Sequence, residues 1–78
     1  MNKKSKSDLL ISLGEKVKKR RIELGHTQEE LAGICGFDRT YISLIERGKR
    51  NISFSNLATL AHGLDSTISD LSRDLVWR

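Results

Sequence analysis

Apolar residues recur every three or four positions along most of the chain, which is the spacing that places them on one face of an α-helix. The first apolar stripe contains Leu13, Val17 and Leu24 and stops before Gly25, a residue that favours the end of a helix. Shorter segments with the same spacing follow. The predicted helices cover about residues 8–24, 28–34 and 39–46, the stretch from Ser53 to a break at residues 63–65, and a last segment within residues 66–78.

The predicted helix boundaries carry residues that cap helices. Thr27, with Glu30 three residues later, has the pattern of a capping box, in which each side chain accepts a backbone N–H of the first turn. Gly36 can end this helix, and Asp38 can cap the next one. Further candidate caps are Ser53 for the fourth helix and Thr67, with Asp70, for the fifth. The pattern therefore predicts an all-α fold, a compact five-helix bundle.

Size and composition suit one small helical domain spanning residues 1–78. A chain of 78 residues buries only around 60% of its unfolded surface, so a cleft enzyme is a poor first hypothesis and oligomerisation would add stability. The composition, 37% apolar and 5% aromatic with no proline, fits a helical bundle. The lysine-rich residues 1–7 are interpreted as a mobile arm, or alternatively as a solvated tail.

Positive charge is concentrated in particular segments of the chain. Lys and Arg number 14 against 10 Asp and Glu, and the net charge of +4 favours an anionic partner. Residues 39–51 hold four basic residues against one acidic residue, whereas residues 52–78 hold two against three. The anionic partner is therefore expected to contact residues 39–51 and not the C-terminal part.

Residues 27–46 are predicted to form two short helices around Gly36, a layout that presents one helix to a DNA groove. This segment resembles the helix-turn-helix domains of the lambdoid phage repressor and Cro type, the XRE family. The residues that carry the resemblance are Arg21, Gly25, Thr27, Gln28, Leu31, Ala32, Gly36, Ile42, Ser43, Glu46 and Gly48. The segments DRTYIS, IERG and RN-I-S, at residues 38–43, 45–48 and 50–53, are similar to the controller proteins of restriction–modification systems. The resemblance implies a lambda-repressor-like, DNA-binding transcriptional regulator.

The exposed face of the helix over residues 39–46 is expected to read bases in the major groove, where each base pair shows a distinct pattern of donors and acceptors. Arg39 is the first candidate, because a guanidinium can bond O6 and N7 of guanine together. Its alternatives are a phosphate contact or a solvated side chain. Thr40 could meet a thymine methyl or a base edge. Ser43 and Leu44 lie one turn further on, and Leu44 could instead belong to the core.

Phosphate contacts are expected to supply most of the affinity, because they release counterions from the DNA. Gln28 stands at the start of the second helix, where the helix dipole favours negative charge. Tyr41 could bond a phosphate through its hydroxyl or pack its ring against the second helix. A basic loop after the third helix is expected to clamp the DNA backbone, although it could also be a solvated charged loop. Its candidate residues are Arg47, Lys49, Arg50, Asn51 and Ser53.

The family resemblance pairs Arg21 with Glu46 in an internal salt bridge that ties the first helix to the end of the third. Such a pair fixes geometry more reliably than it adds net stability, and the loss of one partner leaves a costly unpaired charge. Both residues are therefore expected to belong to the scaffold.

The last predicted helix, within residues 66–78, carries more apolar surface than a bundle of this size needs and little positive charge. These properties suit an isologous contact between two copies of the chain, so we interpret it as a dimerisation helix. The alternative is that its apolar residues close the core of one copy. The candidate residues are Ile68, Leu71, Leu75 and Trp77.

The sequence predicts neither an active site nor a metal or cofactor site. His26 and His62 lie at different predicted helix ends, and Cys35 has no ligand spacing with either of them. No apolar run approaches the roughly 20 residues that span a bilayer, and the lysine-rich start lacks the apolar core of a signal peptide. We expect a cytoplasmic, bacterial or phage-encoded protein that is not an enzyme and has no cofactor, small-molecule ligand or membrane partner.

The functional hypothesis is a homodimeric, sequence-specific transcriptional regulator whose partner is double-stranded operator DNA. Two-fold symmetry would place two reading helices about one DNA turn apart, which implies a palindromic operator. The resemblance to controller proteins implies regulation of its own gene and of a restriction endonuclease gene, with RNA polymerase as a partner in activation. The alternatives are a phage-type or general XRE repressor, and an antitoxin-like module that binds a toxin through its apolar C-terminus.

Overall fold

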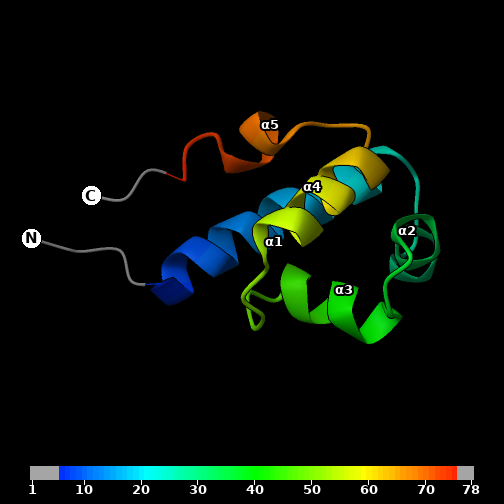
Figure 1. The fold of residues 1–78 in the computed structure, drawn as a ribbon, viewed down its shortest axis with the longest axis horizontal. Helices are drawn as coiled ribbons and strands as arrows, with labels where there is room; N and C mark the ends of the chain where they lie inside the picture. Colours follow the sequence, from blue (N-terminus) through cyan, green and yellow to red (C-terminus); the bar gives the residue numbers. More distant parts are fainter. Residues whose placement is uncertain (1–5, 76–78) are drawn as a thin grey trace, which may run out of the picture.

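The computed structural model describes residues 6–75 of the chain, and within this range all the regular elements are helices. The helices are α1 (Lys6–Glu23), α2 (Gln28–Cys35), α3 (Arg39–Glu46), α4 (Phe54–Gly63) and α5 (Ile68–Ser72) (Figure 1). The prediction of five helices in this order is confirmed. The first begins two residues earlier than predicted, so the last two residues of the predicted arm at residues 1–7 belong to α1.

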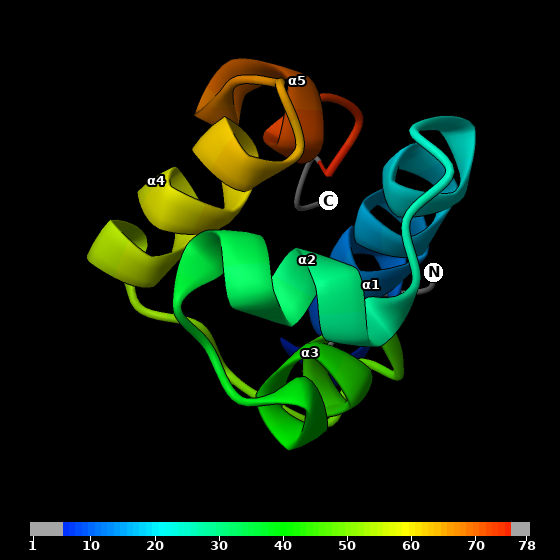
Figure 2. The same ribbon diagram turned by 90° about the vertical axis from the view of Figure 1, so that its right-hand side faces the viewer.

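The helices surround one core, with α3 and α5 on opposite sides of the molecule (Figure 2). Helix α1 is the longest and packs against both α3 and α5. Helix α2 packs against α3 and α4, and α4 packs against α5. The surface of α3 that turns away from the core is therefore separated from the C-terminal segment by the thickness of the domain.

The core is built from the apolar stripes of the helices. The largest fully buried side chains are Leu31, Ile42, Leu60, Leu64 and Val17, which come from α1, α2, α3, α4 and the residue that ends α4. Val17 belongs to the apolar stripe that the sequence predicts for the first helix. Contributions from four consecutive helices allow a domain of this size to enclose a continuous core.

Local capping fixes where the motif helices begin and end. Thr27 Oγ1 accepts the Glu30 backbone N–H at 3.0 Å and Glu30 Oε1 accepts the Thr27 backbone N–H at 2.8 Å, which confirms the predicted capping box. The hydrogen bond from the Thr27 backbone, followed by that with its side chain, lowers the pKa of the Glu30 carboxyl. Gly36 ends α2 in the left-handed region at φ 73°. Asp38 occupies the N-cap position of α3, but its side chain makes no capping hydrogen bond.

Helix α5 is shorter than the segment at residues 66–78 that we interpreted as a dimerisation helix. It ends at Ser72, because Arg73 is extended and Asp74 has a positive φ of 68°. The Asp70 carboxylate accepts a hydrogen bond from Arg73 at 2.6 Å, while Thr67 caps the helix as predicted. Residues 76–78, which include Trp77, lie outside the described residues.

Gly14 lets α1 approach the end of α3 closely. A Cβ atom at this position would meet the Ile45 carbonyl oxygen and would lie 2.6 Å from the Glu46 carbonyl oxygen. Both obstacles are backbone atoms, which move less readily than the end of a side chain. The crossing of α1 and α3 therefore depends on the absence of a side chain at Gly14.

Replacement of Gly14 by alanine is expected to lower the free energy of unfolding by about 1–3 kcal/mol, because the added methyl group overpacks this crossing. Urea denaturation measures the change. Gly33→Ala is the matched control, since nothing lies within 4 Å of a Cβ at Gly33 and alanine in a helix interior adds up to about 1 kcal/mol. Equal unfolding free energies for Gly14→Ala and the unchanged protein would contradict the account of the crossing.

Candidate nucleic-acid interface

The first turn of α3 presents two exposed polar residues. Arg39 and Thr40 point away from the core, whereas Ile42 and Ile45 of the same helix are 0% and 2% exposed. The side chains of Arg39 and Thr40 make no hydrogen bond or ion pair with any residue between 6 and 75. They are placed as a reading surface requires, on a rigid element and without internal partners.

The other two candidate readers lie closer to the domain. Ser43 and Leu44 are half-buried. Leu44 is not among the apolar side chains that pack against the core, although its neighbour Ile45 is a core residue. Both residues therefore border the exposed start of α3 without being fully accessible.

A cationic loop continues directly from α3. The side chains of Arg47, Lys49 and Arg50 are exposed, as are those of Asn51 and Ser53. Ser53 Oγ accepts the Asn56 backbone N–H at 3.2 Å, so this hydroxyl caps α4 as the sequence predicts. The structure thus places three exposed cations within four residues of the end of α3.

The loop begins at a fixed turn. Gly48 has a φ of 70°, and a Cβ atom on it would lie 2.7 Å from the Ile11 backbone of α1. The Lys49 backbone N–H donates to the Leu44 carbonyl at 2.9 Å. At the far end of the loop, Ile52 packs against the core. The cations are therefore carried by a loop that is attached to the domain at both ends.

A buried ion pair joins α1 to the last residue of α3. Arg21 donates from Nε to Glu46 Oε2 at 2.6 Å and from its second terminal nitrogen to Glu46 Oε1 at 3.0 Å. A third hydrogen bond, at 2.7 Å, reaches the His26 carbonyl. The two side chains belong to residues that are only 9% and 7% exposed. The hydrogen bonds to Glu46 raise the pKa of the Arg21 guanidinium although burial alone would lower it. This is the salt bridge that the family resemblance implied.

Gln28, a candidate phosphate ligand, belongs to the same network. Its Nε2 donates to Glu46 Oε1 at 3.1 Å. An amide nitrogen carries two hydrogens, so one N–H remains for a phosphate at the start of α2. The contact also attaches the first residue of α2 to the pair between α1 and α3. This second role was not predictable from the sequence, because it depends on the folded positions of two residues that are 18 positions apart.

Tyr41 lies between three neighbours. Its ring meets the ring of Phe37 edge to face, with centroids 5.0 Å apart, and the Arg50 guanidinium lies 5.4 Å from its centroid. Its hydroxyl oxygen accepts a hydrogen bond from Asn56 Nδ2 at 3.0 Å. The sequence left a phosphate contact and packing on the second helix as alternatives, and the ring packs on Phe37, which follows α2. Asn56 was not identified from the sequence.

The predicted dimer residues differ in their surroundings. Leu71 is 3% exposed and belongs to the core of its own chain, which is the alternative that the sequence left open. Ile68 and Leu75 pack partly against that core. Phe54, at the start of α4, is 74% exposed and is the most exposed large apolar side chain among the described residues. Apolar surface for a partner is thus present on Phe54 and on parts of Ile68 and Leu75, but not on Leu71.

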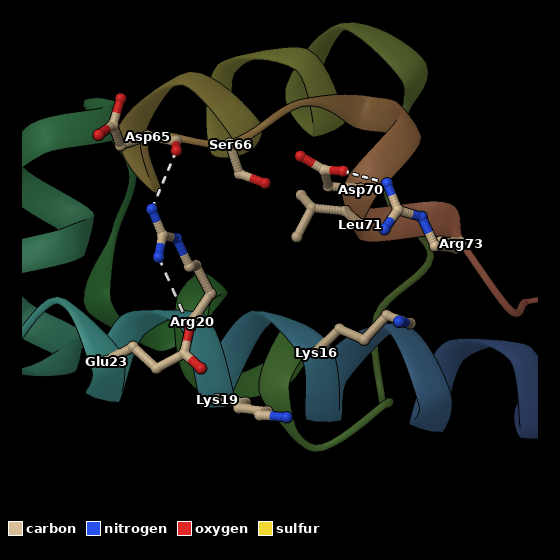
Figure 3. Close-up of a pocket in the computed structure, with 9 residues that line it drawn as sticks. All are labelled: Lys16, Lys19, Arg20, Glu23, Asp65, Ser66, Asp70, Leu71 and Arg73. Carbon is tan, nitrogen blue, oxygen red and sulfur yellow. Dashed lines mark hydrogen bonds and ion pairs between the residues drawn. The ribbon is translucent and has the colours of Figure 1, made fainter.

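A cleft of about 490 Å³ lies between α1 and the segment that runs from Asp65 to Arg73 (Figure 3). At one end Arg20 donates to the carbonyls of Leu64 and Asp65, at 2.9 and 3.1 Å, and pairs with Glu23 at 3.6 Å. These bonds connect α1 to the turn between α4 and α5. Arg20 therefore anchors the C-terminal segment, a role that the sequence did not reveal.

The described residues contain no group of three or more His, Cys, Asp or Glu side chains that could hold a metal ion. Burial raises the pKa of the Cys35 thiol, which favours its protonated form. Between residues 6 and 75, no helix is long and apolar enough to cross a membrane.

Among residues 6–75 the domain is helical, and a buried ion pair supports the short helix α3. The start of this helix is polar and exposed, and a cationic loop follows its end. This is the architecture of helix-turn-helix DNA-binding proteins. The family model described as helix-turn-helix, HTH_3, matches residues 17–71 of the chain. The match includes all of the motif and extends to the buried residue of α5.

Comparison with related proteins identifies a smaller group within the helix-turn-helix proteins. Control protein C.MunI from Mycoplasma sp. is 44% identical over 70 residues, which cover 88% of this chain and 95% of the relative. The crystal structure of the restriction–modification controller protein C.AhdI from Aeromonas hydrophila is 39% identical, with a TM-score of 0.78 over 80% of this chain and 94% of that one. The controller protein C.Esp1396I, solved as a tetramer with its natural 35 base-pair operator, is 40% identical, with a TM-score of 0.77 over 86% and 88% of the chains.

The chain belongs to the helix-turn-helix family and, within it, to the controller proteins of restriction–modification systems. The predicted fold class and the predicted family are therefore confirmed. The named relatives are transcriptional controllers and not enzymes, which agrees with the prediction that this chain is not an enzyme.

Removal of the Glu46 carboxylate is expected to destabilise the protein and weaken its binding to DNA. Glu46→Ala leaves the Arg21 guanidinium buried without its partner, a loss of about 3–5 kcal/mol. Thermal and urea denaturation measure the stability, and a duplex titration measures the affinity. Glu23→Ala is the control, because it removes an exposed partner of Arg20 and should change the stability by less than about 1 kcal/mol. An unchanged melting curve for Glu46→Ala would refute the scaffold role.

Proposed function

We propose that the protein is a homodimeric transcriptional regulator that binds palindromic operators and controls its own gene and a restriction endonuclease gene. The observation that carries the proposal is the exposed, internally unpartnered start of α3, beside a loop with three exposed cations. Its family membership supports the same function, since its relatives are control proteins and one of them was solved on its operator. Activation of a promoter would add RNA polymerase as a protein partner.

Arg39 is proposed as the main base reader. It lies at the N-terminal end of α3, which is the end that helix-turn-helix proteins direct at base edges. Its guanidinium can bond guanine through two parallel hydrogen bonds. Thr40 is proposed to meet a thymine methyl or a base edge beside it. Ser43 and Leu44 are half-buried and are proposed to contact bases only at the border of this surface.

The cationic loop is proposed to bind the phosphates next to the reading helix. Exposed Arg and Lys side chains that neutralise phosphates release counterions, which gives affinity independent of sequence. The loop starts at the residue after α3, so reading and phosphate contacts would reach the same stretch of duplex. Arg47, Lys49, Arg50, Asn51 and Ser53 supply this contact, with Gln28 and Tyr41 donating from α2 and α3.

A second copy of the chain is proposed as the partner of the C-terminal apolar surface. The solved relative binds its operator as a tetramer, so association of this fold on DNA has a precedent. Ile68 and Leu75 are only partly covered by their own core, and the exposed Phe54 lies on α4, which packs against α5. Trp77 is proposed to belong to the same contact. Leu71 supports this surface from inside the core.

Footprinting on the DNA upstream of the chain's own gene tests the DNA-binding proposal. The unchanged protein is expected to protect a two-fold symmetric site at low salt and to lose affinity steeply as salt rises. Arg39→Ala should weaken binding to that site by about 5- to 150-fold, the discrimination of a bidentate guanine contact, with little effect on unrelated duplex. Arg73→Ala removes the same charge from the end of α5 and is the control.

Two outcomes would contradict this proposal. Absence of any duplex binding at low salt would exclude a DNA-binding regulator and would favour the protein-interaction alternative. Equal weakening of specific and unrelated duplex by Arg39→Ala would show that Arg39 contacts phosphate and does not read a base.

Sedimentation equilibrium at micromolar concentration tests the dimer. The unchanged protein is expected to sediment as a dimer, and Phe54→Ala combined with Trp77→Ala to shift it towards monomer, because both changes remove apolar contact area. Ile22→Ala is the control, since Ile22 is 57% exposed on α1 outside the proposed contact. A monomer for the unchanged protein, or a dimer unaffected by the double change, would refute this interface.

A further inference from the structure

Asn56 contacts Tyr41, a residue of the proposed DNA-binding surface, from the neighbouring helix α4. It lies on α4, and its side chain is half-buried. Its Nδ2 donates to the Tyr41 hydroxyl oxygen at 3.0 Å. Arg50, from the cationic loop, lies over the ring of the same tyrosine at 5.4 Å. One side chain of α4 is thus connected to two residues of the proposed phosphate-binding surface.

We infer that Asn56 is a positioning residue for DNA binding, which orients the Tyr41 hydroxyl and, through the Tyr41 ring, holds Arg50 ready for a phosphate. The inference rests on the proposed function. It adds a residue that does not touch DNA but determines how two phosphate ligands are presented.

The hydrogen bond from Asn56 determines the direction of the Tyr41 proton. A phenol has one O–H donor and lone pairs that accept. Because the Asn56 amide occupies a lone pair, the hydroxyl hydrogen must point elsewhere, and no residue between 6 and 75 accepts it. It is therefore available to donate to a phosphate oxygen outside the domain. Without Asn56, the hydroxyl hydrogen would no longer be held to one direction.

The Tyr41 ring in turn limits the motion of Arg50. A free arginine on an exposed loop has many rotamers, and each contact with DNA must order one of them. The cation–π contact with Tyr41 restricts Arg50 before DNA arrives, and the edge-to-face contact with Phe37 holds the tyrosine ring. A ring fixed by both Phe37 and Asn56 gives Arg50 a stationary platform.

The test is a double-mutant cycle of Asn56→Ala and Tyr41→Phe, with binding to the duplex upstream of the chain's own gene as the readout. Asn56→Ala is expected to weaken binding about fivefold, in the range of one lost hydrogen bond. It should also make the slope of log K against log salt shallower by up to about one unit, because Arg50 is less well placed. In the Tyr41→Phe background, which lacks the hydroxyl, Asn56→Ala should cause no further loss of affinity.

Thr59→Ala is the matched control. Thr59 is exposed on α4, three residues from Asn56. Its hydroxyl donates to the Ser55 carbonyl of the same helix and to no other residue between 6 and 75. It should leave affinity and salt slope unchanged. The melting temperature of each variant distinguishes a positioning role of Asn56 from a contribution to fold stability. Asn56→Ala is expected to lower affinity and yet to melt within a few degrees of Thr59→Ala.

Three results would overturn the inference. The first is an unchanged affinity in Asn56→Ala. The second is that Asn56→Ala costs as much affinity in the Tyr41→Phe background as in the unchanged protein. The third is an affinity loss that disappears when the variants are compared at equal fractions of folded protein. If the unchanged protein fails to bind the duplex, the proposed function is wrong. If it binds and Asn56→Ala binds equally well, only the positioning role is wrong.

Discussion

The buried pair between Arg21 and Glu46 is the interaction on which the proposed DNA-binding surface depends. It joins the last turn of α1 to the last residue of α3, and Gln28 adds the start of α2 to the same carboxylate. Gly14 lets α1 approach the end of α3 closely enough for this contact. Three helices therefore meet at one carboxylate. The orientation of α3 relative to α1 and α2 is fixed by a few hydrogen bonds with defined geometry.

The exposed surface follows from this fixed support. Because Ile42 and Ile45 face the core and Glu46 is satisfied internally, the first turn of α3 and the loop after Glu46 are left to contact a partner. The loop does not extend freely, since Gly48 lies against α1 and Arg50 lies over Tyr41. On the opposite side, Arg20 connects α1 to the turn before α5, and α5 carries part of the apolar surface proposed for self-association. The surfaces proposed for reading and for assembly therefore lie on different faces of one small domain.

The sequence predicted the elements whose causes are local. Helix positions, the Thr27 capping box and the inward position of Val17 follow from spacing and from contacts within a few residues. Contacts made after folding were not predictable in the same way. Arg20 reaches carbonyls 44 and 45 residues away, Gln28 reaches a residue 18 positions on, and Asn56 reaches back 15 positions. The end of α5 was also missed, because apolar spacing continues through residues whose backbone leaves the helix.

The most direct test of the central claim replaces the ion pair by apolar residues of similar size, as Arg21→Met with Glu46→Leu. A well-packed apolar pair often equals or exceeds a buried ion pair in stability, so this variant separates the orientation of α3 from the stability of the fold. The measurement is its affinity for the operator duplex, taken at a temperature where urea denaturation shows it folded. We predict a loss of affinity of at least about tenfold in a folded protein, a difference of roughly 1.4 kcal/mol. Full affinity in the folded double variant would contradict the claim that this pair sets the geometry of DNA binding.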